Sequence, residues 1–188
     1  MSKTKMDPSA ATYPMPVVLV GALVNGKANY MAVAWFSQVS AEPPMIAVAL
    51  NRSRWTVEGV VENKSFSINV PGRSLVDEAD YCGLVSGEKH DKSSLFSTFY
   101  GDLKTAPMIE ECPLCFECSL ANSLDLPSHT IFVGKVAAVY ADQHYVKGGK
   151  LDLRKMEPFV LDSPGRSYMG LGSDIAKAWS AGKKLIKK

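Results

Sequence analysis

The stretch that decides the fold runs from Asn25 to Asn63 and reads NGKANYMAVAWFSQVSAEPPMIAVALNRSRWTVEGVVEN. It opens on Asn25-Gly26, a pair that favours the tight turn of a two-residue β-hairpin. The flanking residues are mostly apolar, so we expect one strand over residues 16–24 and a return strand over residues 27–36. Because a two-residue turn joins only antiparallel strands, the stretch predicts an antiparallel sheet.

Side chains in the return strand should alternate between its two faces. One face would carry Tyr30, Ala32, Ala34 and Phe36, and the other Met31, Val33 and Trp35. Residues 37–44 are expected to form a loop, because Pro43-Pro44 disfavours regular pairing. Residues 45–50 are apolar and read as a core strand.

The core strand leads into a basic turn, Asn51-Arg52-Ser53-Arg54. We expect Ser53 to cap a helix that runs to about Glu62. The turn then brings hydroxyl, amide and guanidinium groups to a helix N-terminus, which is a common arrangement for binding phosphate. A solvated surface turn is the alternative.

The remaining elements are shorter. Strands are expected over residues 66–70, 114–120 and 130–141, with a polar loop over 121–129. Helices are expected from Ser74, over residues 93–100, and from Ser173 through Ile175 and Trp179. The sequence therefore predicts a mostly β fold with short helices, built as an antiparallel six-stranded barrel. It divides into a flexible tail (1–12), one domain (13–172) and a C-terminal helix (173–188).

The composition excludes several classes of protein. The chain has 188 residues, 46% hydrophobic and 21% charged, which suits a single globular domain. A net charge of +2 does not indicate a nucleic-acid binder. We expect no membrane-spanning segment and no secretory signal, and therefore a cytoplasmic protein whose four cysteines are free thiols.

Three of those cysteines have a spacing that suggests a metal site. Cys112, Cys115 and Cys118 form a C-x2-C-x2-C pattern, as at the start of bacterial iron–sulfur motifs. The fourth cysteine and its proline are missing, and a strand would turn Cys115 away from the other two. We expect buried thiols and no metal, with a cysteine-ligated metal protein as the less favoured alternative.

A nucleotide-like ligand must be bound without a dinucleotide fingerprint or a P-loop, since both motifs are absent from the sequence. The cations Arg52, Arg54 and Lys92 lie next to hydroxyl residues in the sequence, and Arg and Lys pair with phosphate. His129 stands at the entrance of a predicted strand, where it could contact a substrate or serve only the structure.

The order of these signals resembles the flavin reductase-like family, the FMN-binding split barrels that include flavoredoxin. The resemblance covers about residues 13–172. The segments that carry it are Pro16-Val-Val-Leu-Val, Asn29-Tyr-Met-Ala-Val-Ala-Trp35, Val39-Ser40 with Pro43-Pro44, Phe66-Ser-Ile-Asn69-Val-Pro71, Cys82-Gly83 with Ser86-Gly87 and Asp91-Lys92, Ala106-Pro107 with Glu117-Cys118, and His129-Thr-Ile-Phe-Val-Gly134-Lys-Val136.

The resemblance implies a six-stranded split barrel that binds FMN near the interface of a homodimer. It implies three groups of cofactor-binding residues. Those along the flavin ring and ribityl chain would be Asn29, Ala34, Trp35, Phe36 and Ser37; those around the phosphate Asn51, Arg52, Ser53 and Thr56; those closing the site Ser86, Gly87, Asp91 and Lys92. Cys118 matches a structural position of the family, while the role of Cys112 and Cys115 stays open.

The implied function is an oxidoreductase that passes electrons from NADH or NADPH through FMN to free flavin, ferric iron or a redox protein. Because the flavin carries the chemistry, no catalytic side chain is required, although His129 is a candidate. The alternative is a flavoredoxin-type electron carrier without its own NAD(P)H turnover.

Overall fold

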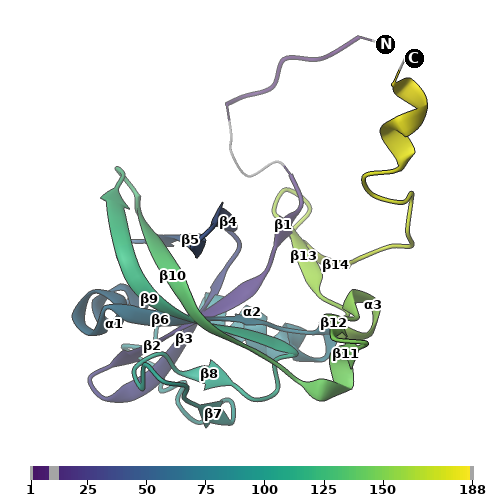
Figure 1. Ribbon diagram of the computed structural model, residues 1–188. Helices are drawn as coiled ribbons and strands as arrows, with labels where there is room; N and C mark the ends of the chain where they lie inside the picture. The colour runs from purple at the N-terminus through teal and green to yellow at the C-terminus, as the bar shows by residue number, and fades with distance from the viewer. Residues whose placement is uncertain (1, 9–12, 187–188) are drawn as a thin grey trace.

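The structure is a computed structural model that describes residues 2–8 and 13–186. Its centre is a seven-stranded antiparallel sheet with the strand order β3-β2-β6-β9-β10-β5-β4 (Figure 1). Its strands are β2 Val18–Val24, β3 Lys27–Val33, β4 Phe36–Ala41, β5 Pro44–Asn51, β6 Ser65–Val70, β9 Leu114–Asp125 and β10 His129–Ala141. The predicted antiparallel, mostly β fold is confirmed, with seven strands in this sheet instead of six.

Smaller elements surround the main sheet. A three-stranded sheet is formed by β1 Met15–Pro16, β13 Phe159–Asp162 and β14 Ser167–Gly170. Two short pairs are β7 Thr98–Phe99 with β8 Met108–Ile109, and β11 Val146–Lys147 with β12 Lys150–Leu151. The helices are α1 Thr56–Asn63, η1 Arg73–Leu75, α2 Val76–Leu84, η2 Gln143–Tyr145, α3 Leu153–Met156 and η3 Ala181–Leu185. No helix in the described part of the chain is long and apolar enough to cross a membrane.

The predicted hairpin at Asn25-Gly26 is confirmed. Asn25 has φ 51° and Gly26 has φ 75°, as the turn between β2 and β3 requires. The strands pair from Val24 with Lys27 to Val18 with Val33. This register is set locally and fixes which side chains of β3 point inward.

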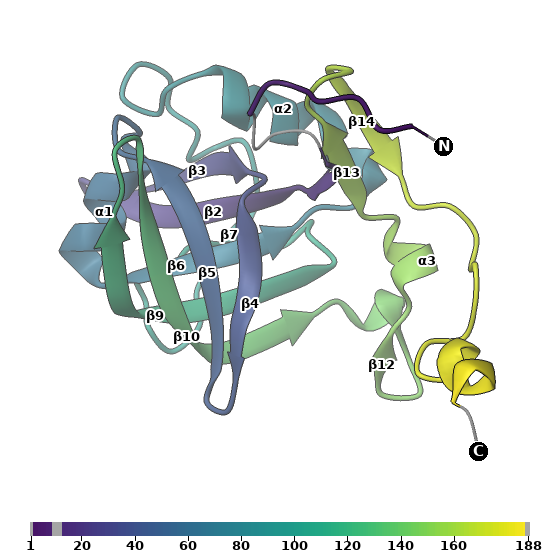
Figure 2. The ribbon, with the colours of Figure 1, turned by 90° about the horizontal axis from the view of Figure 1, so that it is seen from above.

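The sheet bends round so that its two edges come from consecutive strands. β3 and β4 lie at opposite ends of the strand order, yet only Ala34 and Trp35 separate them in the chain. The backbone N–H of Ala49 donates to the carbonyl of Trp35, which extends the pairing of β4 with β5 into this link. The curved sheet is open between β3 and β4 (Figure 2), as in a split barrel.

Two apolar cores lie on the two faces of the sheet. The inner core combines β2, β5, β6 and β10 with Val60 of α1, and includes Val20, Leu50, Phe66 and Phe132. The outer core lies between the sheet, α2 and the segment 96–112, and includes Tyr30. β3 contributes Ala28 and Tyr30 to the outer core, and Met31 and Val33 to the inner core. The predicted alternation holds as far as Val33.

The alternation fails beyond Val33. Phe36 packs against the inner core, on the side of Met31 and not of Tyr30. The reason is that β3 ends at Val33 and the chain begins β4 at Phe36, so the phase changes at the link.

The loop predicted over residues 37–44 is wrong. Most of it is β4, and Pro44 opens β5 opposite Ala41. A proline is tolerated there because it is the first residue of its strand and pairs with an edge strand.

Two predicted helix starts are displaced. The N–H and Oγ of Ser53 both donate to Oδ1 of Asn51, at 3.0 and 2.9 Å. This side-chain turn competes with capping, so α1 begins only at Thr56. The helix predicted from Ser74 is preceded by η1, and α2 itself starts at Val76.

The helix predicted over residues 93–100 is also wrong, since that segment contains turns and β7. Ser93 donates its N–H and Oγ to Asp91, which favours a turn over a helix. The loop predicted over residues 121–129 is shorter, because β9 continues to Asp125 and forms a projecting ribbon with β10 (Figure 1).

The C-terminal prediction is only partly met. No helix starts at Ser173 in the described chain; a short 3-10 helix, η3, begins at Ala181. Residues 187–188 of this predicted helix, and residues 1 and 9–12 of the predicted tail, lie outside the described residues. Residues 2–8 are exposed and have neither helix nor strand.

Candidate functional site

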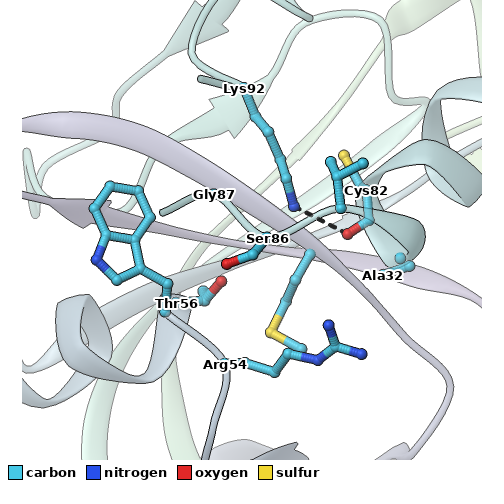
Figure 3. Close-up of a pocket in the computed structure, with 11 residues that line it drawn as sticks. Ala32, Arg54, Thr56, Cys82, Ser86, Gly87 and Lys92 are labelled. Carbon is cyan, nitrogen blue, oxygen red and sulfur yellow. Dashed lines mark hydrogen bonds between the residues drawn. The ribbon is translucent and has the colours of Figure 1, made fainter. Parts of the chain in front are cut away.

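A small pocket with a basic lining, here called the basic pocket, lies between β3, the N-terminus of α1 and the segment that follows α2 (Figure 3). Its volume is about 20 Å³, which is room for a water molecule or for one edge of a ligand. A larger ligand must therefore lie across its mouth. The lining residues are Met31, Ala32, Arg54, Trp55, Thr56, Cys82, Gly83, Val85, Ser86, Gly87 and Lys92.

Lys92 places a buried cation at this pocket. Its side chain is 3% exposed, and Nζ donates to the carbonyls of Tyr30 and Cys82, both at 3.0 Å. An ammonium group has three donors, so one remains for a ligand. Burial lowers the pKa of Lys92; the Cys82 thiol opposes this shift and Arg54 adds to it. Arg54 and Lys92 approach the pocket from opposite sides (Figure 3).

Two hydroxyl groups in the pocket can donate a hydrogen bond to a ligand. Oγ1 of Thr56 accepts a hydrogen bond from Nδ2 of Asn29 at 2.7 Å. Oγ of Ser86 accepts one from the backbone N–H of Glu88 at 3.3 Å. Because each oxygen already accepts from the protein, its own O–H is available for a ligand. Together with the two cations, these hydroxyls give the pocket a lining suited to an anion.

Asn29 contributes an acceptor that lacks a partner. The residue is 2% exposed, and its Oδ1 makes no hydrogen bond within the described chain. A buried amide oxygen without a partner is costly, so it marks a place where a ligand or water donates. Gly87 passes directly over this oxygen: a Cβ at Gly87 would lie 1.9 Å from Oδ1 and 2.7 Å from Cε3 of Trp55.

Replacing Gly87 by alanine should therefore damage the site while leaving the domain folded. The added methyl group must displace Asn29 or the segment that carries Ser86. We expect cofactor affinity to fall by at least about ten-fold, measured by fluorescence titration. Gly170→Ala is a matched control, because a Cβ there meets nothing within 4 Å. Equal affinities for the two variants would show that no ligand uses this corner.

The basic turn lies beside the pocket but only part of it faces inward. Arg54 lines the pocket, whereas the Arg52 side chain does not line it and makes no ion pair with a described residue. The backbone N–H of Arg52 donates to Ser128 at 3.4 Å, which ties the turn to the β9–β10 ribbon. Ser53 uses its hydroxyl proton on Asn51, so this residue shapes the turn.

Trp35 and His129 stack on each other, in a tilted arrangement, next to the turn. Their ring centroids are 4.6 Å apart with an interplanar angle of 38°. The indole is 38% exposed and donates from Nε1 to the sulfur of Met15. His129 pairs with Asn51 across β10 and β5, and Nδ1 lies 2.8 Å from Oγ of Ser128. Partly exposed rings of this kind are suited to stacking on a planar ligand.

The other predicted residues have mixed positions. Ala34 and Phe36 are half-buried beside Trp35, and Ser37 is exposed on β4. Asp91 does not line the pocket; it is exposed and bonds Nζ of Lys27 at 2.8 Å. The hydrogen bond from Lys27, followed by those from Ser93, lowers the pKa of Asp91 well below its usual value.

The structure thus brings together two groups of predicted residues, joined by the basic turn. Asn29, Thr56, Ser86, Gly87 and Lys92 meet at the basic pocket, while Trp35, Asn51 and His129 meet beside it. Six further pocket residues were not predicted from the sequence: Met31, Ala32, Trp55, Cys82, Gly83 and Val85. None of these side chains is a usual anion ligand. Only their closeness in the sequence to predicted site residues could have indicated that they line the pocket.

The cysteines do not gather into a metal site. In the described chain, no three His, Cys, Asp or Glu side chains are placed to hold a metal ion. The predicted separation of Cys112 from Cys115 is wrong, since both belong to the outer core. The strand argument fails because β9 starts at Leu114 and Cys112 lies in the preceding turn. Cys118, in the inner core, is on the opposite face from Cys115, as alternation predicts.

All four thiols should be unreactive in the folded protein. Burial raises the pKa of Cys82 to about 11, raises those of Cys115 and Cys118 to about 12, and raises that of Cys112 well above its usual value. Because the thiolate is the reactive form, a thiol reagent at pH 8 should label almost none of them within minutes. After denaturation it should label all four. Rapid labelling of one native thiol would show that its environment is open.

Comparison with known proteins places the chain in a family. The model described as "Flavin reductase like domain" matches residues 10–155. The crystal structure of flavoredoxin from Methanosarcina acetivorans is 48% identical, with a TM-score of 0.94 over 98% of this chain and 100% of that one. An uncharacterized protein from Aeropyrum pernix is 32% identical; the match covers 79% of this chain and 57% of that relative. FMN reductase (NADH) RutF from Bradyrhizobium diazoefficiens is 24% identical over 74% of this chain and 80% of its own.

The family model covers more than half of the chain, and the fold matches that of the flavoredoxin over nearly its whole length. The resemblance seen in the sequence is therefore confirmed, and the chain belongs to the flavin reductase-like family.

Proposed function

We propose that this protein binds FMN and works as an oxidoreductase. The observation that carries the proposal is the basic pocket, where Arg54, Thr56, Ser86 and Lys92 each have a hydrogen-bond donor available for a ligand. Such a lining suits the phosphate of a mononucleotide. The phosphate would lie across the mouth of the pocket, because the pocket itself has a volume of only about 20 Å³.

The surroundings of the pocket fit the rest of FMN. The orphan Oδ1 of Asn29 offers an acceptor for a donor of the cofactor. The indole of Trp35, which is 38% exposed and stacked on His129, would offer an aromatic surface to an isoalloxazine ring, and the small side chain of Ala34 would leave room beside it. Phe36 and Ser37 lie next along the chain and would border the same ring. The N-terminus of α1, at Thr56, favours negative charge at the basic turn.

When bound, FMN would supply the redox chemistry, hydride acceptance and electron transfer. The protein's own part is to bind and orient. Arg54 and Lys92 would hold the anionic end, Asn29 would accept a hydrogen bond beside Gly87, and Trp35 would contact the ring.

The redox partner distinguishes two versions of this function. In the first, NADH or NADPH reduces the protein directly, and free flavin, ferric iron or a redox protein accepts the electrons; the name of the Bradyrhizobium relative supports NADH. In the second, the protein is an electron carrier without NAD(P)H turnover, which the 48% identity to a flavoredoxin favours. In either case, we propose a cytoplasmic homodimer; four free thiols suit a reducing compartment.

Identification of the cofactor tests the main proposal. Protein prepared with added FMN should show a flavin spectrum, and heat should release one FMN per chain, identified by chromatography. Reconstitution with FAD in parallel provides the comparison. Recovery of FAD alone, or of no flavin, would contradict FMN binding.

Anaerobic mixing with NADH or NADPH separates the two versions. Bleaching of the flavin absorbance within seconds is expected for a reductase. No bleaching, together with ready reduction by dithionite, would favour the electron carrier. His129→Asn removes the imidazole that stacks on Trp35, so it should both weaken FMN binding and slow the reduction.

A further inference from the structure

The last part of the chain leaves the domain as an arm. After β14, residues 171–186, here called the C-terminal arm, run away from the sheet, and η3 stands clear of the domain in both views (Figures 1 and 2). Its large apolar side chains are exposed to water. The exposed fractions are 100% for Ile175, 96% for Trp179, 78% for Leu185 and 75% for Ile186.

This exposure is unusual for side chains of these types. Isoleucine and leucine are among the most buried residues in folded proteins, and tryptophan is highly buried on average. Trp179 also has φ 53°, a conformation that is unfavourable for a bulky residue and persists only when its surroundings enforce it. At 96% exposure the described chain supplies no such surroundings. The arm is therefore shaped for a surface that a single chain lacks.

A groove of matching character lies at the base of the arm. Its volume is about 710 Å³, within the range of sites that enclose several side chains or a small ligand. Val76 of α2, Leu153 of α3 and Phe159 of β13 give it apolar walls, with Tyr168 and Met169 of β14. Leu153 and Met169 are 56% and 52% exposed, so much of this apolar surface is uncovered.

The charged groups that line the groove are already paired, so its apolar walls are the surface left to cover. Arg73 pairs with Glu157 at 3.9 Å, and Arg154 pairs with Asp174 at 2.5 Å. Lys177, Lys183 and Lys184 of the arm would lie at the polar rim, and the apolar side chains of the arm would lie within, as in specific interfaces.

We infer that the C-terminal arm of one copy docks in the groove of a second copy of this chain, and that the exchange is reciprocal. Asp174 is paired with Arg154 at the wall of the groove, so the arm is anchored at the rim and then leads outward. Trp179 and Ile175 thus reach a neighbouring molecule without reversing the chain. Two identical exchanges around a two-fold axis close into a dimer.

The area available is adequate for a stable dimer. A fully exposed aromatic side chain such as Trp179 offers roughly 150–250 Å² for burial. The aliphatic side chains of the arm and the walls of the groove add to this area. The reciprocal exchange forms two equivalent contacts, so the total buried area is doubled. The sum approaches the roughly 1,200 Å² at which stable interfaces begin. The inference assigns a surface to the homodimer proposed above but does not depend on FMN binding.

Sedimentation of full-length variants is the first test. The wild-type chain should be a dimer at micromolar concentration. The double variant Ile175→Glu with Trp179→Glu should remain folded, because both residues are exposed, and its dimer dissociation constant should rise at least a hundred-fold. Val61→Glu, an exposed apolar position on α1 that is 46% exposed, is the matched control and should stay dimeric. A monomeric wild type, or a double variant as dimeric as the wild type, would overturn the inference.

Disulfide trapping separates exchange from folding back. Chains carrying Ile175→Cys and chains carrying Met169→Cys are mixed and oxidised; the native cysteines are buried and provide a low background in the wild type. A covalent dimer in the mixture is expected. When both substitutions are in one chain, bonds within monomers only would overturn the proposal. FMN content measured on the same samples tests only the proposal that the protein binds FMN. Failure of FMN binding can therefore be distinguished from failure of the arm exchange.

Discussion

Replacing Arg54 by alanine is expected to weaken FMN binding by roughly ten- to a hundred-fold, because one charge-assisted hydrogen bond contributes about 1.5–3 kcal/mol. Arg54 lines the basic pocket opposite Lys92, and no ion pair with a described residue competes for its guanidinium group. The substitution should leave the fold intact, since Arg54 is exposed and its turn is held through Asn51.

Arg52→Ala is the matched control for this experiment. Both arginines belong to the same turn, both are exposed and both add the same charge, but only Arg54 lines the pocket. The expected loss for Arg52→Ala is at most about three-fold, the size of a screened long-range effect. Affinities follow from quenching of flavin fluorescence at fixed salt. A larger loss for Arg52 than for Arg54 would move the phosphate to the outer side of the turn, as the sequence alone suggests.

The sequence predicts the basic turn but does not predict which of these two arginines faces the pocket. The turn between β5 and α1 is a local feature, and its basic character is evident from Asn51 to Arg54. Which guanidinium faces inward depends on where α1 begins. The side chain of Asn51 takes up both donors of Ser53 and delays the helix to Thr56. That competition between a cap and a turn has no clear signature in the sequence.

Contacts between distant segments limited the prediction further. The hairpin at Asn25-Gly26 was predictable because its register depends on neighbouring residues. By contrast, Lys92 reaches the carbonyl of Tyr30 across 62 positions of the chain, and only the packed fold reveals that its ammonium group is buried. β4 was missed for a similar reason: it is an edge strand of mostly polar and exposed residues, which reads as a loop until β5 is placed beside it.

Glu117 should produce the largest loss of stability when it is replaced by alanine, about 3–4 kcal/mol. This carboxylate, on β9, is fully buried. It accepts hydrogen bonds from the backbone N–H groups of Leu103 at 2.9 Å and Asp102 at 3.1 Å, which holds the segment before β8 against the sheet. The contact is close: a Cβ at Gly101 would lie 2.4 Å from Oε2 of Glu117 and 2.5 Å from the hydroxyl of Tyr140.

Two further variants identify the cause of that loss. Glu117→Gln keeps the volume but turns an amide N–H toward a backbone donor, so it should cost about half as much, through one unsatisfied group. Glu111 also accepts the N–H of a distant residue, Ser97, but is exposed, so Glu111→Gln should change stability by less than about 1 kcal/mol. Denaturant unfolding at constant FMN gives all three values. Since water can replace the bonds at Glu111 but not those at Glu117, equal effects at the two sites would mean that the segment over Glu117 opens readily in solution.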